Sequence, residues 1–292
     1  MTARQASYHT RMKRVLNYID RHLEDDLGLD ALSSVAAVSK YHFHRQFSAY
    51  FGVSVHRYVQ LARMKRAAQV LAFKDGVSVT ETALDVGYDA PDAFARVFHR
   101  SFGQLPSEFR NSPDWQVWFA RLWPLTNARS KLLKTTYALD EVNIVDVPET
   151  PVAVLQHRGD PALVGETIQK FITWRRAVGL SAASSATYNV FHSDSETTPP
   201  DEFRLDICAA TDRNIEPNDQ GVKAGVIPAG RCAVLRATGT ENVEPAIEFL
   251  YRDWLPESGE DLRDFPLYCQ RVAFFPMVPE HEAITDIFLP LA

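Results

Sequence analysis

The sequence is poor in cysteine and in long apolar runs. Its 292 residues include three cysteines, Cys208, Cys232 and Cys269, an odd number without the paired spacing of metal ligands. This content is typical of a reducing compartment, and we interpret all three as structural thiols. No apolar run approaches the about 20 residues that a membrane helix needs. The first residues also lack the apolar segment of a secretory signal, so we expect a cytoplasmic protein with no membrane partner.

The sequence also lacks the motifs that catalysis and cofactor binding require. It contains no P-loop, no zinc-ligand spacing and no Ser-His-Asp order. His42 and His44 lie two residues apart, and side chains at that spacing diverge on a helix, so they do not predict a metal site. Glu280 and Glu282 flank His281 in a proline-bounded segment, which indicates a solvated turn. We therefore expect no enzyme activity, no cofactor and no metal.

The net charge of −6 hides an uneven distribution. Residues 1–112 contain 15 Lys and Arg against 11 Asp and Glu, a net of +4. The remaining residues contain 16 against 26, a net of −10. A basic part joined to an acidic part fits a phosphate-binding module next to a domain that does not bind nucleic acid. Surface solvation alone can produce the same division.

A ten-residue pattern occurs twice, 51 residues apart. The segments FHRQFSAYFG at 43–52 and FARVFHRSFG at 94–103 place phenylalanines four residues apart on one helix face and an arginine on another. Each copy follows a short apolar helix and a tight break. This order is that of a helix-turn-helix, whose second helix enters the DNA major groove. Two such units predict a transcription regulator that binds two successive grooves of double-stranded promoter DNA.

The residues that we expect to contact DNA lie on the exposed sides of the two second helices. They are Lys40, Tyr41, His44 and Arg45 in the first helix, and Asp92, Ala95, Arg96 and Arg100 in the second. An exposed arginine binds guanine O6 and N7 bidentately, whereas Asp92 repels phosphate and Ala95 offers only a methyl group. We expect the first unit to do most of the base reading and the second to grip the backbone. The alternative role of Arg45 and Arg96 is an ion pair within the domain.

Apolar spacing places the remaining helices of an all-α domain at residues 1–112. It predicts a first helix at about 8–23 and a second helix that ends at Ala36. A third helix, at 55–73, connects the two units. Ser78 and Glu81 form a capping box that opens the second scaffold helix. Residues 113–140 are a tryptophan-rich connector, in which Trp115, Trp118 and Leu122 have the spacing of a short helix that packs against a domain.

Residues 141–292 contain a second repeat, with a period of 80 residues. Ala153-Val154-Leu155, Trp174 and Tyr188 recur as Ala233-Val234-Leu235, Trp254 and Tyr268. Each half has the order strand, helix, strand, strand, with helices at 162–178 and 243–254. The duplicated β-α-β-β unit predicts one α+β domain with an antiparallel sheet, helices on one face and a pseudo-twofold cleft. The aromatic residues either line this cleft or belong to the core.

Residues 25–110 resemble the AraC/XylS family of transcription regulators. The second unit, VTETALDVGYDAPDAFARVFHRSFGQLPSEFR, contains the most specific motif. The resemblance implies seven helices with two helix-turn-helix units on one connecting helix, and RNA polymerase as a partner. It places base-reading residues at the positions of Tyr41, His44, Arg45, Asp92, Ala95 and Arg96.

Residues 141–292 resemble the GyrI-like effector-binding domain, in the motifs IPAG (227–230), WLPESG (254–259) and DIFLPL (286–291). Many such domains hold a glutamate on the strand that begins at Pro266, where it faces cationic or aromatic ligands. This sequence has Cys269 at that position and Arg271 where a tyrosine is common. Without a carboxylate nothing offsets the desolvation of a cation, so we expect an anionic or neutral ligand.

The leading hypothesis is a transcription regulator whose C-terminal cleft binds a small-molecule effector of unknown identity. The residues expected to bind it are Trp174, Asn189, Phe191, Trp254, Cys269 and Arg271. Two alternatives remain open for the C-terminal domain. One is a hydrolase of electrophilic small molecules, which needs a positioned titratable group. The other is a module that binds a protein.

Overall fold

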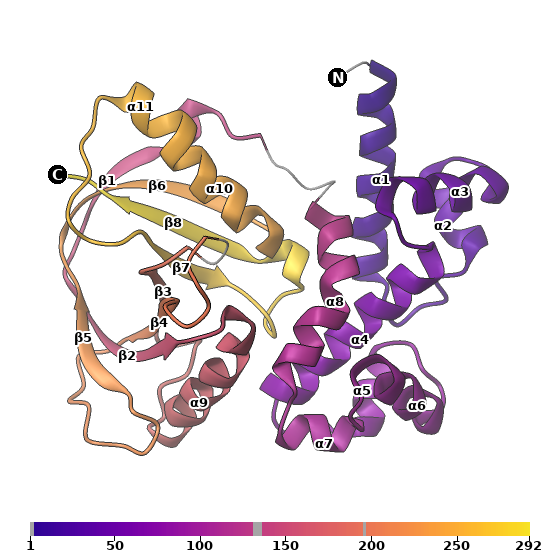
Figure 1. Cartoon of the computed structure of the whole chain (residues 1–292), viewed down its shortest axis with the longest axis horizontal. Helices are drawn as coiled ribbons and strands as arrows, with labels where there is room; N and C mark the ends of the chain where they lie inside the picture. Colours follow the sequence, from indigo (N-terminus) through magenta and orange to yellow (C-terminus); the bar gives the residue numbers. More distant parts are fainter. Residues whose placement is uncertain (1–2, 131–135, 195–196) are drawn as a thin grey trace. The chain divides into compact units, whose positions relative to one another are not determined.

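The computed structural model describes residues 3–130, 136–194 and 197–292 (Figure 1). The chain divides into two compact units, unit 1 at residues 1–134 and unit 2 at residues 135–292. Of the helices in the described part, none combines the length and the apolar content that a membrane crossing requires.

Unit 1 consists of helices. They are α1 (Ala3–Arg21), α2 (Leu29–Ala36), α3 (Lys40–Phe51), α4 (Val55–Phe73), α5 (Val79–Asp85), α6 (Pro91–Phe102), α7 (Pro106–Asn111) and α8 (Trp115–Ser130). The predicted connecting helix coincides with α4, and α3 and α6 are the two predicted second helices. The first helix differs from the prediction, because it begins at Ala3 and ends at Arg21, before Leu23.

Side chains and glycines set the ends of the short helices. The Oγ atoms of Ser39 and Ser54 accept hydrogen bonds from backbone N–H groups in the first turns of α3 and α4. Ser78 and Glu81 form the predicted capping box at the start of α5, with N–O distances of 2.6 and 3.0 Å. Gly52 and Gly103 end α3 and α6 in the left-handed conformation, which fixes the same helix length in both units.

The two phenylalanine stripes form the cores of the two helix-turn-helix units. The buried rings are Phe43, Phe47 and Phe51 in α3, and Phe94, Phe98 and Phe102 in α6. Neighbouring rings in each stripe have centroids 4.5 to 5.8 Å apart in tilted or edge-on geometry. The stripes therefore fix which side of α3 and α6 faces outward.

The turns of the two units differ in detail. Ala37 ends α2 with φ of 53°, a conformation that a non-glycine residue rarely adopts. The second unit has Gly87 in this conformation, with φ of 73°. A Cβ atom at Gly87 would lie 2.6 Å from an Arg63 guanidinium nitrogen and 2.9 Å from the Glu24 carbonyl oxygen. Glycine is therefore required there by space as well as by backbone angle.

The tryptophan-rich segment forms α8, which is longer than predicted. Trp115 is buried and stacks on Phe73 of α4, with centroids 5.4 Å apart. Trp123, in contrast, is largely exposed. Near the end of α8, Nη1 of Arg129 donates to both carboxylate oxygens of Asp20 in α1, at 2.7 and 2.8 Å. The other part of the predicted connector, residues 131–135, lies outside the described residues.

The Asp20–Arg129 pair is expected to be a strong determinant of unit 1 stability. Its side chains are only 12% and 8% exposed, so Asp20→Asn removes a negative charge that is bonded to a buried arginine. We expect Asp20→Asn to lower the free energy of unfolding by about 3–5 kcal/mol, measured by urea titration of the unit 1 transition. The double variant Asp20→Asn/Arg129→Met should recover part of this loss.

The matched control is Lys40→Met, which removes the exposed ion pair of Lys40 with Asp30. Its effect should stay within about 1 kcal/mol. An Asp20→Asn effect as small as that of the control would contradict the assignment.

Unit 2 is built on one antiparallel sheet. Its strands are β1 (Asn143–Val147), β2 (Thr150–Arg158), β3 (Thr187–Phe191), β4 (Arg204–Ala210), β5 (Lys223–Ile227), β6 (Gly230–Thr238), β7 (Tyr268–Ala273) and β8 (Ile284–Pro290). Over the described residues they form eight strands in the order β1-β6-β8-β7-β3-β4-β2-β5. The helices are α9 (Val164–Ala177), α10 (Val243–Phe249), a π-helical stretch (Leu250–Trp254) and α11 (Leu255–Ser258).

The strand register reproduces the 80-residue repeat. Pairing of β2 with β4 becomes the pairing of β6 with β8 when 80 is added to each residue number. At the centre of the sheet β3 pairs with β7, and Asn189 lies directly opposite Cys269, its own counterpart 80 residues on. The pseudo-twofold axis therefore passes between these two residues.

Each half contains one strand that the sequence analysis did not predict. β1 and β5 precede the predicted unit, and each pairs with the opposite half: β1 with β6, and β5 with β2. The repeat thus exchanges its first strands between the halves. The spacing contained the signal, since β1 and β5 end 80 residues apart, directly before Pro148 and Pro228.

The helices cover the two halves of one sheet face. α9 packs through Phe171 and Trp174 on Ala153, Leu155 and Ile207 of the first half. The helical segment at 243–258 packs through Phe249, Leu250 and Trp254 on the second half, including Ile287 and Cys269. We call this side the helix-facing side (Figure 1).

The opposite side of the sheet holds a separate apolar cluster around Tyr268. The Tyr268 ring stacks on Phe288 with centroids 4.8 Å apart, and its hydroxyl lies 3.7 Å from Sγ of Cys232.

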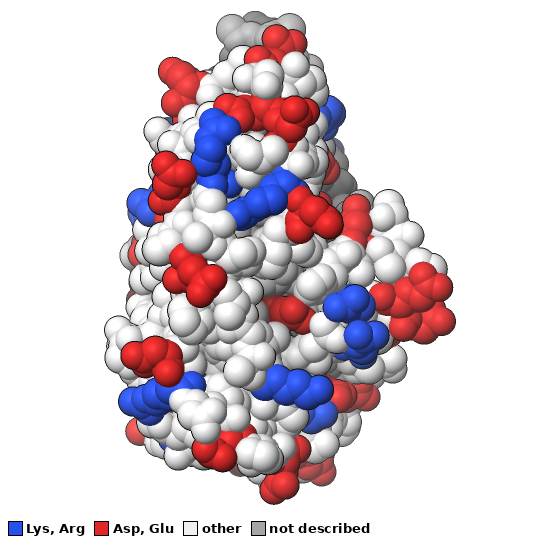
Figure 2. Space-filling model, turned by 90° about the vertical axis from the view of Figure 1, so that its left-hand side faces the viewer, with Lys and Arg blue, Asp and Glu red and all other residues white. Residues whose placement is uncertain are grey.

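Figure 2 shows basic and acidic side chains interspersed on the face that it draws, without a continuous basic area. That face offers no surface of the kind that binds a nucleic-acid backbone.

The three cysteines should be unreactive in the folded protein. All are buried and free, and burial raises the pKa of each thiol, that of Cys269 to about 11. At pH 8 only about one in a thousand Cys269 side chains is then a thiolate, the nucleophilic form. We expect no alkylation by iodoacetamide in native buffer and triple alkylation in denaturant, followed by mass spectrometry. Rapid native labelling of any one cysteine would be inconsistent with this packing.

Candidate functional site

The outward side of α3 presents polar and aromatic groups that its own core does not use. The Ser39 cap and the phenylalanine stripe turn Lys40, Tyr41, His44 and Arg45 toward solvent. Tyr41 is 74% exposed, an unusual position for a large aromatic side chain. No acidic residue occurs in the first turn of α3.

Two local contacts order these side chains. The Arg45 guanidinium lies 5.9 Å from the centre of the Tyr41 ring, a cation–π distance, and Arg45 is exposed. Nζ of Lys40 lies 3.0 Å from a carboxylate oxygen of Asp30 in α2. Both Lys40 and Asp30 are exposed, so this ion pair is weak.

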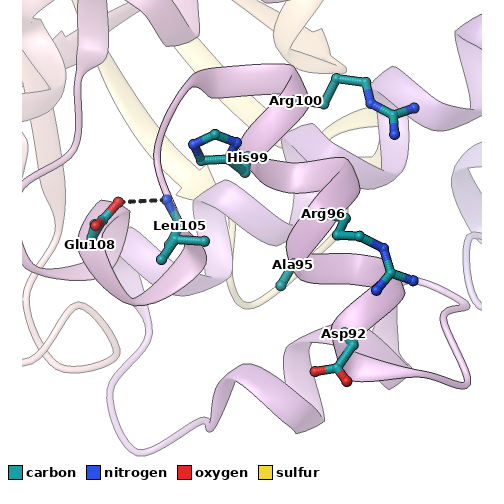
Figure 3. Close-up of a pocket in the computed structure, with 7 residues that line it drawn as sticks. All are labelled: Asp92, Ala95, Arg96, His99, Arg100, Leu105 and Glu108. Atoms are coloured by element: carbon teal, nitrogen blue, oxygen red, sulfur yellow. Dashed lines mark hydrogen bonds between the residues drawn. The ribbon is translucent and has the colours of Figure 1, made fainter.

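The outward side of α6 forms a shallow hollow with α7 (Figure 3). Arg96 and Arg100 project from one side of α6, while Ala95 and His99 lie nearer to α7. The remaining lining residues are Asp92 of α6 and two residues at the start of α7, Leu105 and Glu108. The Glu108 carboxylate accepts a hydrogen bond from the Leu105 backbone N–H at 2.8 Å, so it caps α7.

The two second helices therefore differ in charge. The hollow at α6 is lined by two positive charges, those of Arg96 and Arg100, and by two negative charges, those of Asp92 and Glu108. Neither Arg45 nor Arg96 forms an ion pair with any of the described residues, so the alternative structural role does not apply to them. The sequence analysis missed His99, although it lies four residues after Ala95, on the same side of the helix.

In unit 2 the structure brings together four of the six residues predicted to bind a ligand. Asn189 and Phe191 of β3 lie beside Cys269 and Arg271 of β7, on the helix-facing side next to the pseudo-twofold axis. Asn189, Phe191 and Arg271 are partly exposed, whereas the core residues of both halves beside them are buried. We call these four residues the central strip.

The other two predicted residues lie elsewhere. Trp174 is buried among the residues that α9 covers, and Trp254 among those covered by the second helical segment. The structure therefore places them in two separate core clusters, not in the central strip.

The central strip has no carboxylate at the position of Cys269. The thiol is 2% exposed, and burial raises its pKa to about 11, although the nearby Arg271 charge acts in the opposite direction. The group is therefore a neutral thiol at pH 7. Among the residues that the structure describes, no three His, Cys, Asp or Glu side chains are grouped so that they could hold a metal ion.

Two polar residues next to the strip escaped the sequence analysis. Thr187 of β3 lies opposite Arg271, and its Oγ1 accepts a hydrogen bond at 2.7 Å from Arg175 of α9. Strand register joins these residues, and register is a tertiary property. The sequence did contain a signal for Arg175, because it follows the core residue Trp174 at a position where the second half has Leu255.

Comparison with known proteins agrees with this division of the chain. A family model described as a GyrI-like small molecule binding domain matches residues 140–292, and one described as a helix-turn-helix domain matches residues 32–112. The probable transcriptional regulator YgiV of Escherichia coli K12 is 39% identical over 160 residues, 54% of this chain and 99% of YgiV.

More distant similarities cover parts of other proteins. The right origin-binding protein of Escherichia coli K12 is 26% identical over 141 residues, 48% of this chain and 46% of that protein. The crystal structure of the EcmrR C-terminal domain aligns with 52% of this chain and 96% of its own, at 14% identity and a TM-score of 0.44. With a GyrI-like match over more than half of its length and a helix-turn-helix match before it, the chain belongs to the DNA-binding transcriptional regulators that join an AraC-type domain to a GyrI-like small molecule binding domain.

Proposed function

We propose that this regulator recognises its operator mainly through α3, holds the DNA backbone through α6, and responds to a small molecule bound at the central strip of unit 2. One observation carries the proposal for DNA. The two helices present an arginine at the same position, Arg45 and Arg96, and their other outward residues differ in charge.

Base reading by α3 follows from the groups that it exposes. Arg45 has a bidentate donor pair for guanine, and Tyr41 and His44 add an aromatic face and a ring nitrogen. Since no acidic side chain lies in its first turn, the helix approaches the DNA without a repulsive group. Lys40 can exchange Asp30 for a phosphate.

Backbone contacts by α6 follow from its mixed charge. Arg96 and Arg100 project from the same side of the helix, a suitable arrangement for two phosphate oxygens (Figure 3). Asp92 lies in the first turn, where it favours the helix dipole but weakens attraction to DNA. Ala95 leaves room for a base methyl group and adds little discrimination.

Effector binding at the central strip is supported by its exposure and its polarity. Sheet residues covered by helices are normally apolar and buried, yet Asn189 and Arg271 are polar and partly exposed. For such a ligand to regulate, it must bind the DNA-competent and DNA-incompetent states with different affinities.

We propose a cytoplasmic location, because the proposed target is promoter DNA. RNA polymerase is the partner that the family resemblance implies.

The hydrolase alternative is less well supported. Acid–base catalysis needs a titratable group near neutrality, and the position that carries a glutamate in related domains holds the neutral, buried thiol of Cys269. We therefore propose a regulator without enzyme activity.

Selection of bound fragments from random DNA tests the division between the two helices. Wild type should enrich an asymmetric site of about two helical turns. Arg45→Ala should lose the preference at one or two base pairs, a cost of about 1–3 kcal/mol, whereas Arg96→Ala should bind more weakly with the same preference.

Arg121→Ala, at an exposed arginine of α8, is the matched control and should leave both affinity and preference unchanged. Equal loss of sequence preference in Arg45→Ala and Arg96→Ala would refute the proposed division. Binding that is only salt-sensitive and sequence-blind would refute operator recognition itself.

Reciprocal linkage tests the effector proposal. A compound library is screened for molecules that raise the melting temperature of the full-length protein, and each hit is titrated into a DNA-binding assay. A true effector should change the affinity for DNA about 5- to 150-fold, and DNA should change the affinity for the effector by the same factor. Hits that bind unit 2 without changing DNA affinity would contradict the regulatory role.

A further inference from the structure

Unit 2 contains two arginines without a counter-charge, Arg271 in the central strip and Arg175 near it. Neither Arg175 nor Arg271 forms an ion pair with a carboxylate of the described residues. This is unexpected in the acidic part of the chain, where residues 113–292 have a net charge of −10. Buried or half-buried charges in proteins are usually paired.

Arg175 is held entirely by neutral oxygens. It is 6% exposed, and its guanidinium donates to the carbonyl oxygens of Leu180, Ser181 and Ser185 and to Oγ1 of Thr187, at 2.7 to 3.1 Å. Burial lowers the pKa of Arg175, with no opposing contribution from a carboxylate. The arginine fixes the loop before β3 and leaves its positive charge uncompensated.

Arg271 completes a row of polar groups across β3 and β7. It lies directly opposite Thr187 in the strand register, and the hydroxyl of Thr187 accepts a hydrogen bond from Arg175. The Arg271 guanidinium is 5.6 Å from the centre of the Phe274 ring. Its Nε is buried and has no hydrogen-bond partner within the described residues.

The carboxylates of β4 and β8, the strands that flank β3 and β7, are engaged on the other side of the sheet. Asp206 accepts hydrogen bonds from Gln156 and lies 2.8 Å from Nε2 of His192, and Asp286 pairs with Arg236. Strand alternation separates these acids from Cys269, which faces the helices. They do not neutralise the arginines.

We infer that the central strip binds an anionic small molecule, of the carboxylate class, with Arg271 as its direct charge partner and the Asn189 carboxamide and Thr187 hydroxyl as neutral partners. The inference rests on the proposed effector role of the strip and names the ligand class. An anion supplies the missing counter-charge to the Arg271 guanidinium, and charge-assisted hydrogen bonds of this kind are the strong ones. A cation would be repelled by the positive charge of Arg271.

Three probes of one shape and different charge test the inference: benzoate, benzamide and benzamidine. Each is titrated calorimetrically into the full-length protein in low-chloride buffer, up to the millimolar range in which ligands of this size are expected to bind. Benzoate should bind at least about tenfold more tightly than benzamide, and benzamidine more weakly than either.

Variants of Arg271 identify the site. Arg271→Gln should abolish the preference for benzoate, and Arg271→Lys should retain part of it, because lysine keeps the charge but loses the fork of donors. Arg252→Gln, at an exposed arginine of the π-helical stretch, is the control and should bind benzoate as wild type does. A circular dichroism melt of each variant verifies its fold.

Equal or tighter binding of benzamide or benzamidine at this strip overturns the anion inference and leaves the effector proposal standing. Benzoate binding that Arg271→Gln does not change also overturns it, because the anion then binds elsewhere. Absence of benzoate binding throughout the millimolar range overturns it as well. The effector proposal fails separately, when no compound that binds unit 2 alters the affinity for DNA.

Discussion

The pairing of β3 with β7 is the contact on which unit 2 depends. It joins two similar halves into one sheet, and it places each half's third strand beside its own counterpart, so Asn189 faces Cys269. Next to the axis the sheet carries partly exposed polar side chains, Asn189 and Arg271, beside the buried thiol of Cys269.

Both units are duplicated, and in both the copies share a core but differ in their outward residues. The phenylalanines of α3 and α6 occupy equivalent positions because each stripe fills one interior. Outward positions are free of that constraint, and there Tyr41 and His44 correspond to Asp92 and Ala95. In unit 2 the copies differ at partly exposed positions beside the pseudo-twofold axis, where Phe191 of one half corresponds to Arg271 of the other. Duplication thus supplies two scaffolds, and the differences between copies supply specificity.

Local patterns predicted the helices better than the sheet. The spacing of apolar residues in 55–73 and the capping box at Ser78 each act within a few residues, so they are visible in the sequence. β1 and β5 were missed because each is a short, largely exposed strand whose partner belongs to the other half. The Asp20–Arg129 pair was missed for a similar reason, since 109 positions separate its members.

The sequence by itself determined the two repeats, the helix-turn-helix units and the exposed arginines Arg45 and Arg96. These features depend on residue type and spacing, which the chain states directly. Only the tertiary structure decided that Arg175, Thr187 and Arg271 form one row, and that Trp174 and Trp254 lie in separate cores. Such contacts depend on strand register and helix packing, and these are set by the sum of many weak interactions over the whole unit.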